Sequence, residues 1–393
     1  MDSAIVTPKY VSDFSCIGPD CEDSCCIGWN IYIDKKSYKK TMAHPQLKGL
    51  AKSAMKKIKR SDDQWAIIRT DSKGACLFLD SKKLCKIHAI AGEETLGETC
   101  RTFPRTSHTR ESDKYETLSL SCPEAARLIL FSPDAFMFER KLSGAQITSY
   151  PSPDWLTKTY DYSIELLLNE HLNWQQALLS IGFLINSADK VWQKESPASV
   201  LDSRFEQLSL LAEQGAFQEQ YQTLSYVCEH QAQAFASIHG MLIDAHPRRN
   251  GPRFTEIDDA ISDMLDKDRV LDIDRINRAW NDIASPALEE HGDIFKRYLL
   301  YYMYHEYFPT TLDDKPQSAF RLIVLDCFML RCYLAVIANK NNGLSQRDII
   351  LCFQTYHVVR QHQSTFIQGA TEIMEKFSFS NVAGVISLLK TQD

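Results

Sequence analysis

The distribution of cysteine is the feature that most restricts what this chain can fold into. The chain has 393 residues and 12 cysteines, and eight of these fall within the first 122 residues. The eight are Cys16, Cys21, Cys25, Cys26, Cys76, Cys85, Cys100 and Cys122. The other four stand singly in apolar, helix-like segments, where a free cysteine acts as a small buried hydrophobe; they are Cys228, Cys327, Cys332 and Cys352. The two groups predict two different roles for one residue type.

We interpret the N-terminal eight as metal ligands rather than as disulfides. The first ten residues lack the apolar core of a signal peptide, so we expect a cytoplasmic protein whose thiols stay reduced. Clustered cysteines in such a protein more often bind metal or perform redox chemistry. Thiolates are soft ligands that select zinc, copper(I) or iron–sulfur clusters. The sequence therefore predicts a metal centre in its N-terminal third.

The spacing of the cysteines leaves the identity of the metal open. Structural zinc sites commonly use C-x2-C pairs, and the chain contains none. Cys85 and His88 have two residues between them and could supply half of a zinc site. The adjacent Cys25 and Cys26 cannot easily turn both sulfur atoms toward one small ion, which modestly favours a larger iron–sulfur cluster.

Several common chemistries are excluded by missing motifs. No two glycines have a single residue between them, so the dinucleotide fingerprint and the glycine-rich loop of doubly wound methyltransferases are absent. No glycine precedes a lysine, so there is no P-loop. The C-x3-C-x2-C arrangement fails because Gly28 stands where the third cysteine is required. A formal net charge of −7 argues against a general nucleic-acid binder.

The chain length suggests two domains, and we predict a mainly α fold. Residues 1–145 would form a loop-rich, metal-bound domain, and residues 150–393 an all-α domain, with a polar run at 143–153 as the boundary. Within the first domain we expect a short strand at 65–70. We also expect a helix that begins at Pro123, directly after Cys122. Lysines at 48, 52, 56 and 59 have the spacing of one exposed helix face.

From residue 154 onward, apolar residues recur at three- and four-residue steps, as buried helix faces require. We predict helices over 204–239, 254–265, 295–308 and 320–338. The last stretch is apolar enough to suggest a membrane span. However, it holds Arg321, Asp326 and Arg331, which are costly in a bilayer, so we predict a buried core helix and no membrane partner. The tyrosines of 298–307 are interpreted as core, with an aromatic cage as the alternative. Arg248, Arg249 and Arg253 are interpreted as a solvated loop, with carboxylate binding as the alternative.

Three N-terminal segments resemble a known family. They are FSCIGPDCEDSCCIGWNIYID (14–34), ACLFLDSKKLCKIHAIAGEETLGETCRTFPR (75–105) and LSLSCPEAARLIL (118–130). Together they are similar to the flagellin lysine-N-methylase family, over roughly residues 10 to 135. The resemblance implies a [4Fe–4S] cluster held by the cysteines, S-adenosylmethionine as the methyl donor, and surface lysines of flagellin as acceptors. It also implies action in the cytoplasm, before flagellin is exported.

Candidate site residues follow from this resemblance and from proximity to the cysteine motifs. Only four cysteines can bind one such cluster, and the sequence does not say which four. The first choices are Cys21, Cys25, Cys76, Cys85 and Cys100, with Cys16, Cys26 and Cys122 also considered. A base is needed to deprotonate the lysine, for which the candidates are Glu93, Glu94 and Asp80. Arg101 and Arg105 are candidates for binding the carboxylate of the donor.

Two other functions are compatible with the same residues. The first is an iron–sulfur protein that passes electrons to a partner. The second is a zinc-stabilised module whose helical domain binds another protein. Iron, sulfide and zinc content would separate these alternatives from one another.

Overall fold

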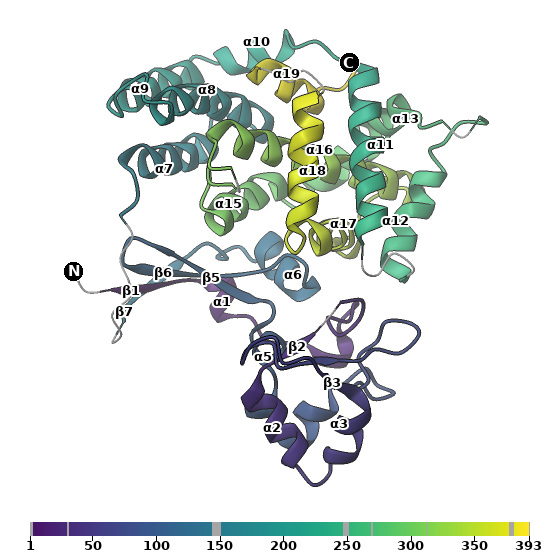
Figure 1. Ribbon diagram of the computed structural model, residues 1–393. Helices are drawn as coiled ribbons and strands as arrows, with labels where there is room; N and C mark the ends of the chain where they lie inside the picture. The colour runs from purple at the N-terminus through teal and green to yellow at the C-terminus, as the bar shows by residue number, and fades with distance from the viewer. Residues whose placement is uncertain are drawn as a thin grey trace.

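The computed structural model describes residues 3–29, 31–143, 151–246, 251–268, 270–311, 313–376 and 381–392. Helices dominate, so the predicted mainly α fold class is confirmed. Figure 1 shows a large helical part, a sheet at one end of it, and a small lobe beyond that sheet. The predicted division into 1–145 and 150–393 stays a prediction, because its boundary falls mostly on residues 144–150, outside the described part.

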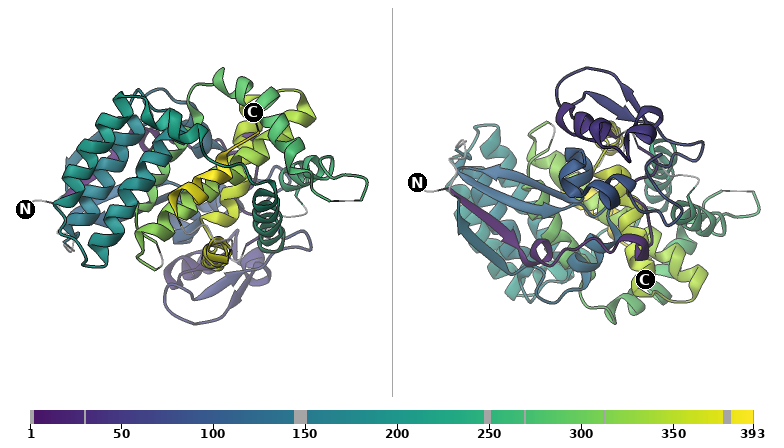
Figure 2. Two further views of the ribbon diagram at one scale, coloured as in Figure 1. Left: turned by 90° about the horizontal axis from the view of Figure 1, so that it is seen from above. Right: turned by 90° about the horizontal axis from the view of Figure 1, so that it is seen from below.

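A four-stranded sheet joins the two ends of the cysteine-rich region. Its strand order is β5 (Arg105–Arg110), β6 (Asp113–Leu118), β1 (Ala4–Pro8) and β7 (Phe138–Leu142). Strand β1 runs parallel to β6 and antiparallel to β7, whereas β5 and β6 form an antiparallel hairpin. The right view of Figure 2 shows this sheet lying across one end of the helices. We did not predict this sheet from the sequence.

The sheet and its two helices belong to the same hydrophobic core as the helical part. Helix α1 (Lys9–Ser12) follows β1, and helix α6 (Pro123–Phe131) follows β6. Tyr10 and Ile129 are fully buried in the core that the C-terminal helices build. The hydroxyl of Tyr10 also lies 2.9 Å from Oγ1 of Thr117. The predicted start of α6 at Pro123 is confirmed, with Cys122 in the capping position.

The small lobe has a separate hydrophobic core. It contains the sheet β2–β4–β3, formed by β2 (Tyr32–Ile33), β4 (Ala66–Ile68) and β3 (Met55–Lys57). Four helices surround it: α2 (Lys35–Ala43), α3 (Lys48–Ala54), α4 (Lys86–Ala91) and α5 (Glu98–Thr102). Strand β4 confirms the strand predicted at 65–70. The prediction that the lysines at 48, 52, 56 and 59 share one helix face is wrong, because α3 ends at Ala54 and the next residues pair with β4 as a strand.

The C-terminal part is all helical, as predicted. The helices are α7 (Asp154–Leu168), α8 (Trp174–Trp192), α9 (Val200–Glu213), α10 (Ala216–Gln222), α11 (Cys228–Ala245), α12 (Pro252–Ser262), α13 (Ile273–Ala279), the π-helix η3 (Trp280–Ala284), α14 (Ser285–Glu289), α15 (Ile294–Glu306), α16 (Pro316–Asn341), α17 (Gln346–Arg360), α18 (Ser364–Lys376) and α19 (Val382–Ile386). The segment predicted as helical over 204–239 is divided into three helices. One break falls at Gly215, whose φ of 73° is left-handed.

Helix α16 passes through the centre of this part and is buried on almost every side. Its charged side chains have partners: Asp326 forms a buried ion pair with Arg360 at 2.9 Å, and Arg331 donates to the Leu389 carbonyl at 2.8 Å.

Within the described residues, no helix is long and apolar enough to cross a membrane. The tyrosines of α15 are core, as predicted. Arg248 and Arg249 lie outside the described residues.

Candidate metal centre

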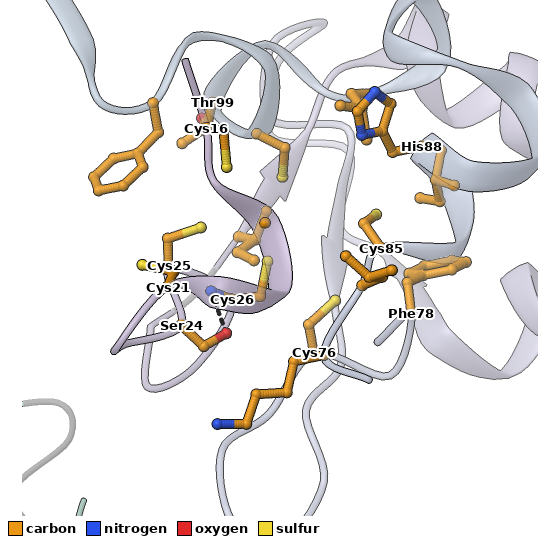
Figure 3. A pocket seen from close by; sticks show the side chains of 18 of the residues that line it. Cys16, Cys21, Ser24, Cys25, Cys26, Cys76, Phe78, Cys85, His88 and Thr99 are labelled. Atoms are coloured by element: carbon orange, nitrogen blue, oxygen red, sulfur yellow. Dashed lines mark hydrogen bonds between the residues drawn. The ribbon is translucent and has the colours of Figure 1, made fainter. Parts of the chain in front are cut away.

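All eight N-terminal cysteines line one cavity of about 220 Å³. The cavity lies in the small lobe and is completed by residues 121–123 at the start of α6. Figure 3 shows the sulfur atoms of Cys26, Cys76 and Cys85 directed toward a shared space, with Cys16 and Cys25 beside it. Segments that are far apart in sequence therefore bring their thiols to one place. That these thiols bind a metal stays a prediction.

The backbone brings the first two cysteine segments together. The amide of Gly28 donates to the carbonyl of Gly74 at 3.0 Å, and the amide of Cys76 donates to the carbonyl of Cys26 at 2.9 Å. Gly28 and Gly74 have φ angles of 90° and 78°, a backbone conformation that residues other than glycine rarely adopt. This close pairing places Cys76 beside the Cys25–Cys26 loop.

Short helices position three further cysteines. Cys85 precedes α4, and the amide of Lys86 fixes this turn by donating to the Phe78 carbonyl at 2.8 Å. Cys100 lies within α5, and Cys122 precedes α6. Each of these three thiols lies at or within a helical turn, so the backbone fixes its position more firmly than an open loop would.

Burial makes the thiolate form of these cysteines costly when no cation is present. Desolvation by burial raises the pKa of Cys76 to about 11 and the pKa of Cys100 and Cys122 to about 12. For Cys26 the pKa is raised first by a hydrogen bond with the Cys25 thiol and then by burial. The thiols of Cys25 and Cys26 therefore interact with each other, and both line the cavity. Metal binding here must displace protons, which makes it pH-dependent.

The donor set is rich in sulfur, a soft ligand that suits zinc or an iron–sulfur cluster. Across the described ranges, no three His, Cys, Asp or Glu side chains are grouped closely enough to hold one metal ion. The thiols instead surround a cavity whose other wall is apolar, formed by side chains such as Ile31, Phe78 and Leu96. Apart from the cysteines, its ionisable lining residues are Asp23, Lys83 and His88. Sulfur donors spread around a cavity suit an iron–sulfur cluster.

The proposed catalytic carboxylates do not line this cavity. Glu94 lies in a second, polar pocket on the outer side of α2, and the neighbouring Glu93 is exposed. Asp80 accepts hydrogen bonds from the backbone amides of Lys82 and Leu84 at 2.8 and 2.9 Å, which lower its pKa. These contacts account for Asp80 as a turn-stabilising residue. The catalytic role of the three carboxylates stays a prediction.

The two arginines proposed to bind the methyl donor also lie outside the cavity lining. Arg101 forms an ion pair with Glu98 on the same helix, at the edge of the second pocket. Arg105 donates to the Phe14 carbonyl at 3.0 Å and its guanidinium lies over the ring of Phe14. Both arginines have structural partners, and donor binding by them stays a prediction.

Sequence reasoning missed the residues through which the helical part reaches the cavity. Gln354 of α17 donates from Nε2 to the Asp23 carboxylate at 2.7 Å and to the Ser121 carbonyl at 3.1 Å. Arg253 of α12 donates from Nε to the amide oxygen of Gln354 at 2.8 Å. Asp23 and Ser121 both line the cavity. No sequence signal could have linked these residues, because the contact spans the whole chain.

Comparison with known proteins agrees with this geometry. The family model "FliB lysine N-methylase C-terminal domain" matches residues 160–388, and the CxxCxxCC family, described as "Putative zinc- or iron-chelating domain", matches residues 15–123. The flagellar biosynthetic protein FliU of Salmonella muenchen is 36% identical over 142 residues, which cover 35% of this chain and 84% of that protein. A lysine-N-methylase of Salmonella choleraesuis (strain SC-B67) is 23% identical over an alignment of 419 residues that covers 98% of each chain. No solved structure matches.

These matches cover both the helical part and the thiol-lined cavity. The description of the second family names zinc and iron, and the cavity's sulfur donors suit both metals. The first match covers more than half of the chain. The chain therefore belongs to the FliB lysine N-methylase family, as its N-terminal motifs predicted.

Proposed function

We propose that this protein methylates the ε-amines of surface lysines on flagellin, with S-adenosylmethionine as donor and a [4Fe–4S] cluster in the thiol-lined cavity. The observation that carries this proposal is the convergence of all eight N-terminal cysteines on that one cavity. The names of the relatives add support. One is called a flagellar biosynthetic protein and two are called lysine-N-methylases.

Four thiols are the best candidates for holding the cluster. The Cys100 thiol lies close enough to Cys85, Cys76 and Cys25 for all three to influence its pKa. Cys21 and Cys122 interact with each other and with Cys25, apart from Cys85 and Cys100. We therefore propose Cys76, Cys85 and Cys100 as ligands, with either Cys25 or Cys26 as the fourth, because Cys26 also interacts with Cys76 and Cys100. A cluster bound there would supply an iron centre capable of Lewis-acid or redox chemistry.

The apolar wall of the cavity would help to prepare the acceptor. A lysine ammonium has no lone pair, so it must lose a proton before it accepts a methyl group. Ile31, Ile68 and Leu96 line the cavity with side chains that offer no hydrogen bonds. Transfer from water to such a wall disfavours the charged ammonium and lowers the pKa of the entering amine.

The test is methyl transfer by anaerobically purified protein to purified flagellin, with isotope-labelled S-adenosylmethionine. Mass spectrometry would locate the label. We expect label on flagellin lysines that disappears in Cys100→Ala and persists in Cys352→Ala, a matched change in the helical core. Iron-loaded protein that leaves flagellin unlabelled would contradict the proposal.

One observation favours a zinc-bound module as the second candidate. His88 lines the same cavity as Cys85, which supports their use as two of the ligands of a zinc ion. Stoichiometric zinc in a colourless protein without methyl transfer would support this alternative. His88→Ala would then reduce zinc content, whereas an all-cysteine cluster would keep its iron in that variant.

A further inference from the structure

Strand β7 forms an exposed edge of the four-stranded sheet. It pairs with β1 on one side, and no strand of the described residues pairs with its other side. All of its residues are exposed, and the apolar Phe138 and Leu142 keep 50% and 70% of their surface open to solvent. An exposed sheet edge is a template for pairing with another chain. What this edge can pair with depends on which of its backbone groups face outward.

The hydrogen bonds to β1 show which backbone groups of β7 face outward. The amide of Lys9 donates to the carbonyl of Met137 at 2.8 Å, and the amide of Ser143 donates to the carbonyl of Ser3 at 2.7 Å. In an antiparallel pair, residues bonded to the neighbouring strand alternate with residues whose N–H and C=O point the other way. The odd-numbered residues of β7 therefore face β1, and the even-numbered residues present their backbone groups at the free edge. The three outward-facing residues are Phe138, Arg140 and Leu142.

The sequence of β7 is complementary to itself when two copies run antiparallel. With Arg140 opposite Arg140 of a second copy, Phe138 lies opposite Leu142. In the same register Glu139 lies opposite Lys141. Apolar pairs and opposite-charge pairs across two strands both stabilise a sheet. This register also places outward-facing residues opposite one another, which allows two backbone hydrogen bonds for each facing pair.

Other registers of the same two strands are less favourable. A shift by two residues in one direction places Glu139 opposite Glu139, and a shift in the other direction places Lys141 opposite Lys141. Like charges directly opposite each other destabilise a sheet. A shift by one residue is excluded, because it places outward-facing backbone groups opposite groups that already face β1. The charges on β7 therefore select the register centred on Arg140.

The charged residues of β7 are suited to this pairing. The central Arg140 forms an ion pair with Asp113 of its own chain at 3.0 Å, which offsets the repulsion between two facing arginines. Glu139 and Lys141 form an exposed ion pair with each other at 2.8 Å. Exposed ion pairs contribute little to stability, so little is lost when each exchanges its partner for the same group of a second copy.

We propose that two copies of this protein associate through β7 and form a dimer with one continuous sheet. The strand order β5-β6-β1-β7 of one copy is continued by β7-β1-β6-β5 of the other. A two-fold axis passes between the facing Arg140 residues, as in closed symmetric dimers. Figures 1 and 2 show the small lobe away from β7, so the dimer leaves both thiol-lined cavities uncovered. This inference does not depend on the proposed methylase function.

The test is charge reversal at the two paired positions, measured by sedimentation velocity across a wide range of protein concentration. The protein is purified without oxygen, so that exposed thiols cannot cross-link two copies. Glu139→Lys places lysines opposite each other, and Lys141→Glu places glutamates opposite each other. Each variant alone should self-associate more weakly by about tenfold or more. Mixing the two variants restores opposite charges at both positions, so the mixture should dimerise as the wild type does.

The backbone pairing is tested by Arg140→Pro, which removes an outward-facing N–H without removing a hydrogen bond to β1. Proline is tolerated at a sheet edge whose N–H faces solvent. Arg140→Ala is the matched control, because it removes the same ion pair with Asp113 but keeps the N–H. We expect the proline variant to be monomeric and the alanine variant to dimerise, with equal helix content by circular dichroism.

Three results would overturn the proposal. The first is a wild-type protein that stays monomeric at every concentration. The second is a dimer that persists in Arg140→Pro or in both charge-reversal variants, which would show that the copies associate through another surface. The third is a mixture of the two charge-reversal variants that remains monomeric.

Discussion

The two groups of cysteines in this protein show that burial alone does not decide what a thiol does. Burial raises the pKa of Cys332 in the helical core to about 11, the same value as for Cys76 in the cavity. The difference lies in their neighbours. Cys76 is influenced by the thiols of Cys85 and Cys25, whereas Cys332 is influenced by Arg331.

The helical core and the cavity also differ in how closely their side chains pack. Cys327, Cys332 and Cys352 are fully buried among side chains that fill the core around α16. The eight N-terminal thiols surround a cavity instead. A protein interior is normally packed without voids, so a space lined by soft ligands indicates a place for a bound group.

The largest expected effect comes from replacing a cysteine with alanine, compared between the N-terminal group and the helical core. Cys100→Ala should abolish cluster binding and methyl transfer, because it removes one of the four proposed ligands. Cys352→Ala should keep both and lower the free energy of unfolding by about 1 kcal/mol, as expected for a small deletion in a core. Iron content, methyl transfer and urea unfolding measure these outcomes. Equal iron content in the two variants would remove the distinction between the groups.

Acid should destabilise the helical part through His305. Burial, followed by the charges of Arg360 and His362, lowers the pKa of His305 to about 3, whereas an unfolded histidine titrates near 6.5. At pH values between about 3 and 6.5, His305 binds a proton in the unfolded state but not in the folded state. Stability should therefore fall as pH drops from about 6.5 to 3, by about 1.4 kcal/mol per pH unit from this group.

Urea unfolding of His305→Gln and the wild type at several pH values measures this contribution. We expect the wild type to lose stability more steeply than the variant below pH 6.5. Parallel pH dependence of the two proteins would show that His305 is not held neutral in the fold.

The contact between the helical part and the cavity should be sensitive to Gln354. Gln354→Leu leaves the buried Arg253 without its Nε partner and removes a hydrogen bond from Asp23. Leaving a buried polar group unpaired costs about 1–3 kcal/mol. We also expect lower iron occupancy, because the Cys21–Cys25 loop loses an anchor. Gln317→Leu, which breaks a half-buried contact with Asn186, is the control that should keep full occupancy; equal occupancy in both variants would argue against the anchor.

The smallest expected effect on the metal centre comes from changes in packing within the helical part alone. A Cβ atom added at Gly182 on α8 would lie 2.4 Å from Val382 and 2.6 Å from Phe320, so Gly182→Ala should cost about 1–3 kcal/mol. Gly240 on α11 has open space around it, so Gly240→Ala should stabilise by about 0.5–1 kcal/mol. Thermal unfolding measures both. Iron content should not change in either variant, and a drop would show that the two regions are more tightly coupled than we infer.

The sequence predicted those features that depend on local pattern. The separation of eight cysteines from four was visible in their positions, and Pro123 marked the start of α6. Apolar periodicity identified the helices of the C-terminal part, and charges within 320–338 indicated a buried helix rather than a membrane span. Apolar periodicity did not reveal α17, because this helix is buried on nearly every side and lacks separate apolar and polar faces.

Features that depend on distant contacts could not be predicted. Strand β1 pairs with β6, which lies more than a hundred residues away in the sequence, so local pattern could not reveal this pairing. Strand β5 is polar and mostly exposed, so it lacks the alternation of apolar and polar residues that marks a half-buried strand. Glu93 and Glu94 were chosen for their proximity in sequence to the cysteines, yet they do not line the cavity. Only the folded chain places Gln354 beside Asp23 and Ser121.

The most direct test of the account is the metal content of the anaerobically purified wild-type protein. Iron, acid-labile sulfide and zinc would be assayed together with the visible absorbance. The account predicts about four iron and four sulfide per chain in a brown protein, the composition of a [4Fe–4S] cluster held by four cysteines. Stoichiometric zinc, with no iron or sulfide, in a colourless protein would contradict it.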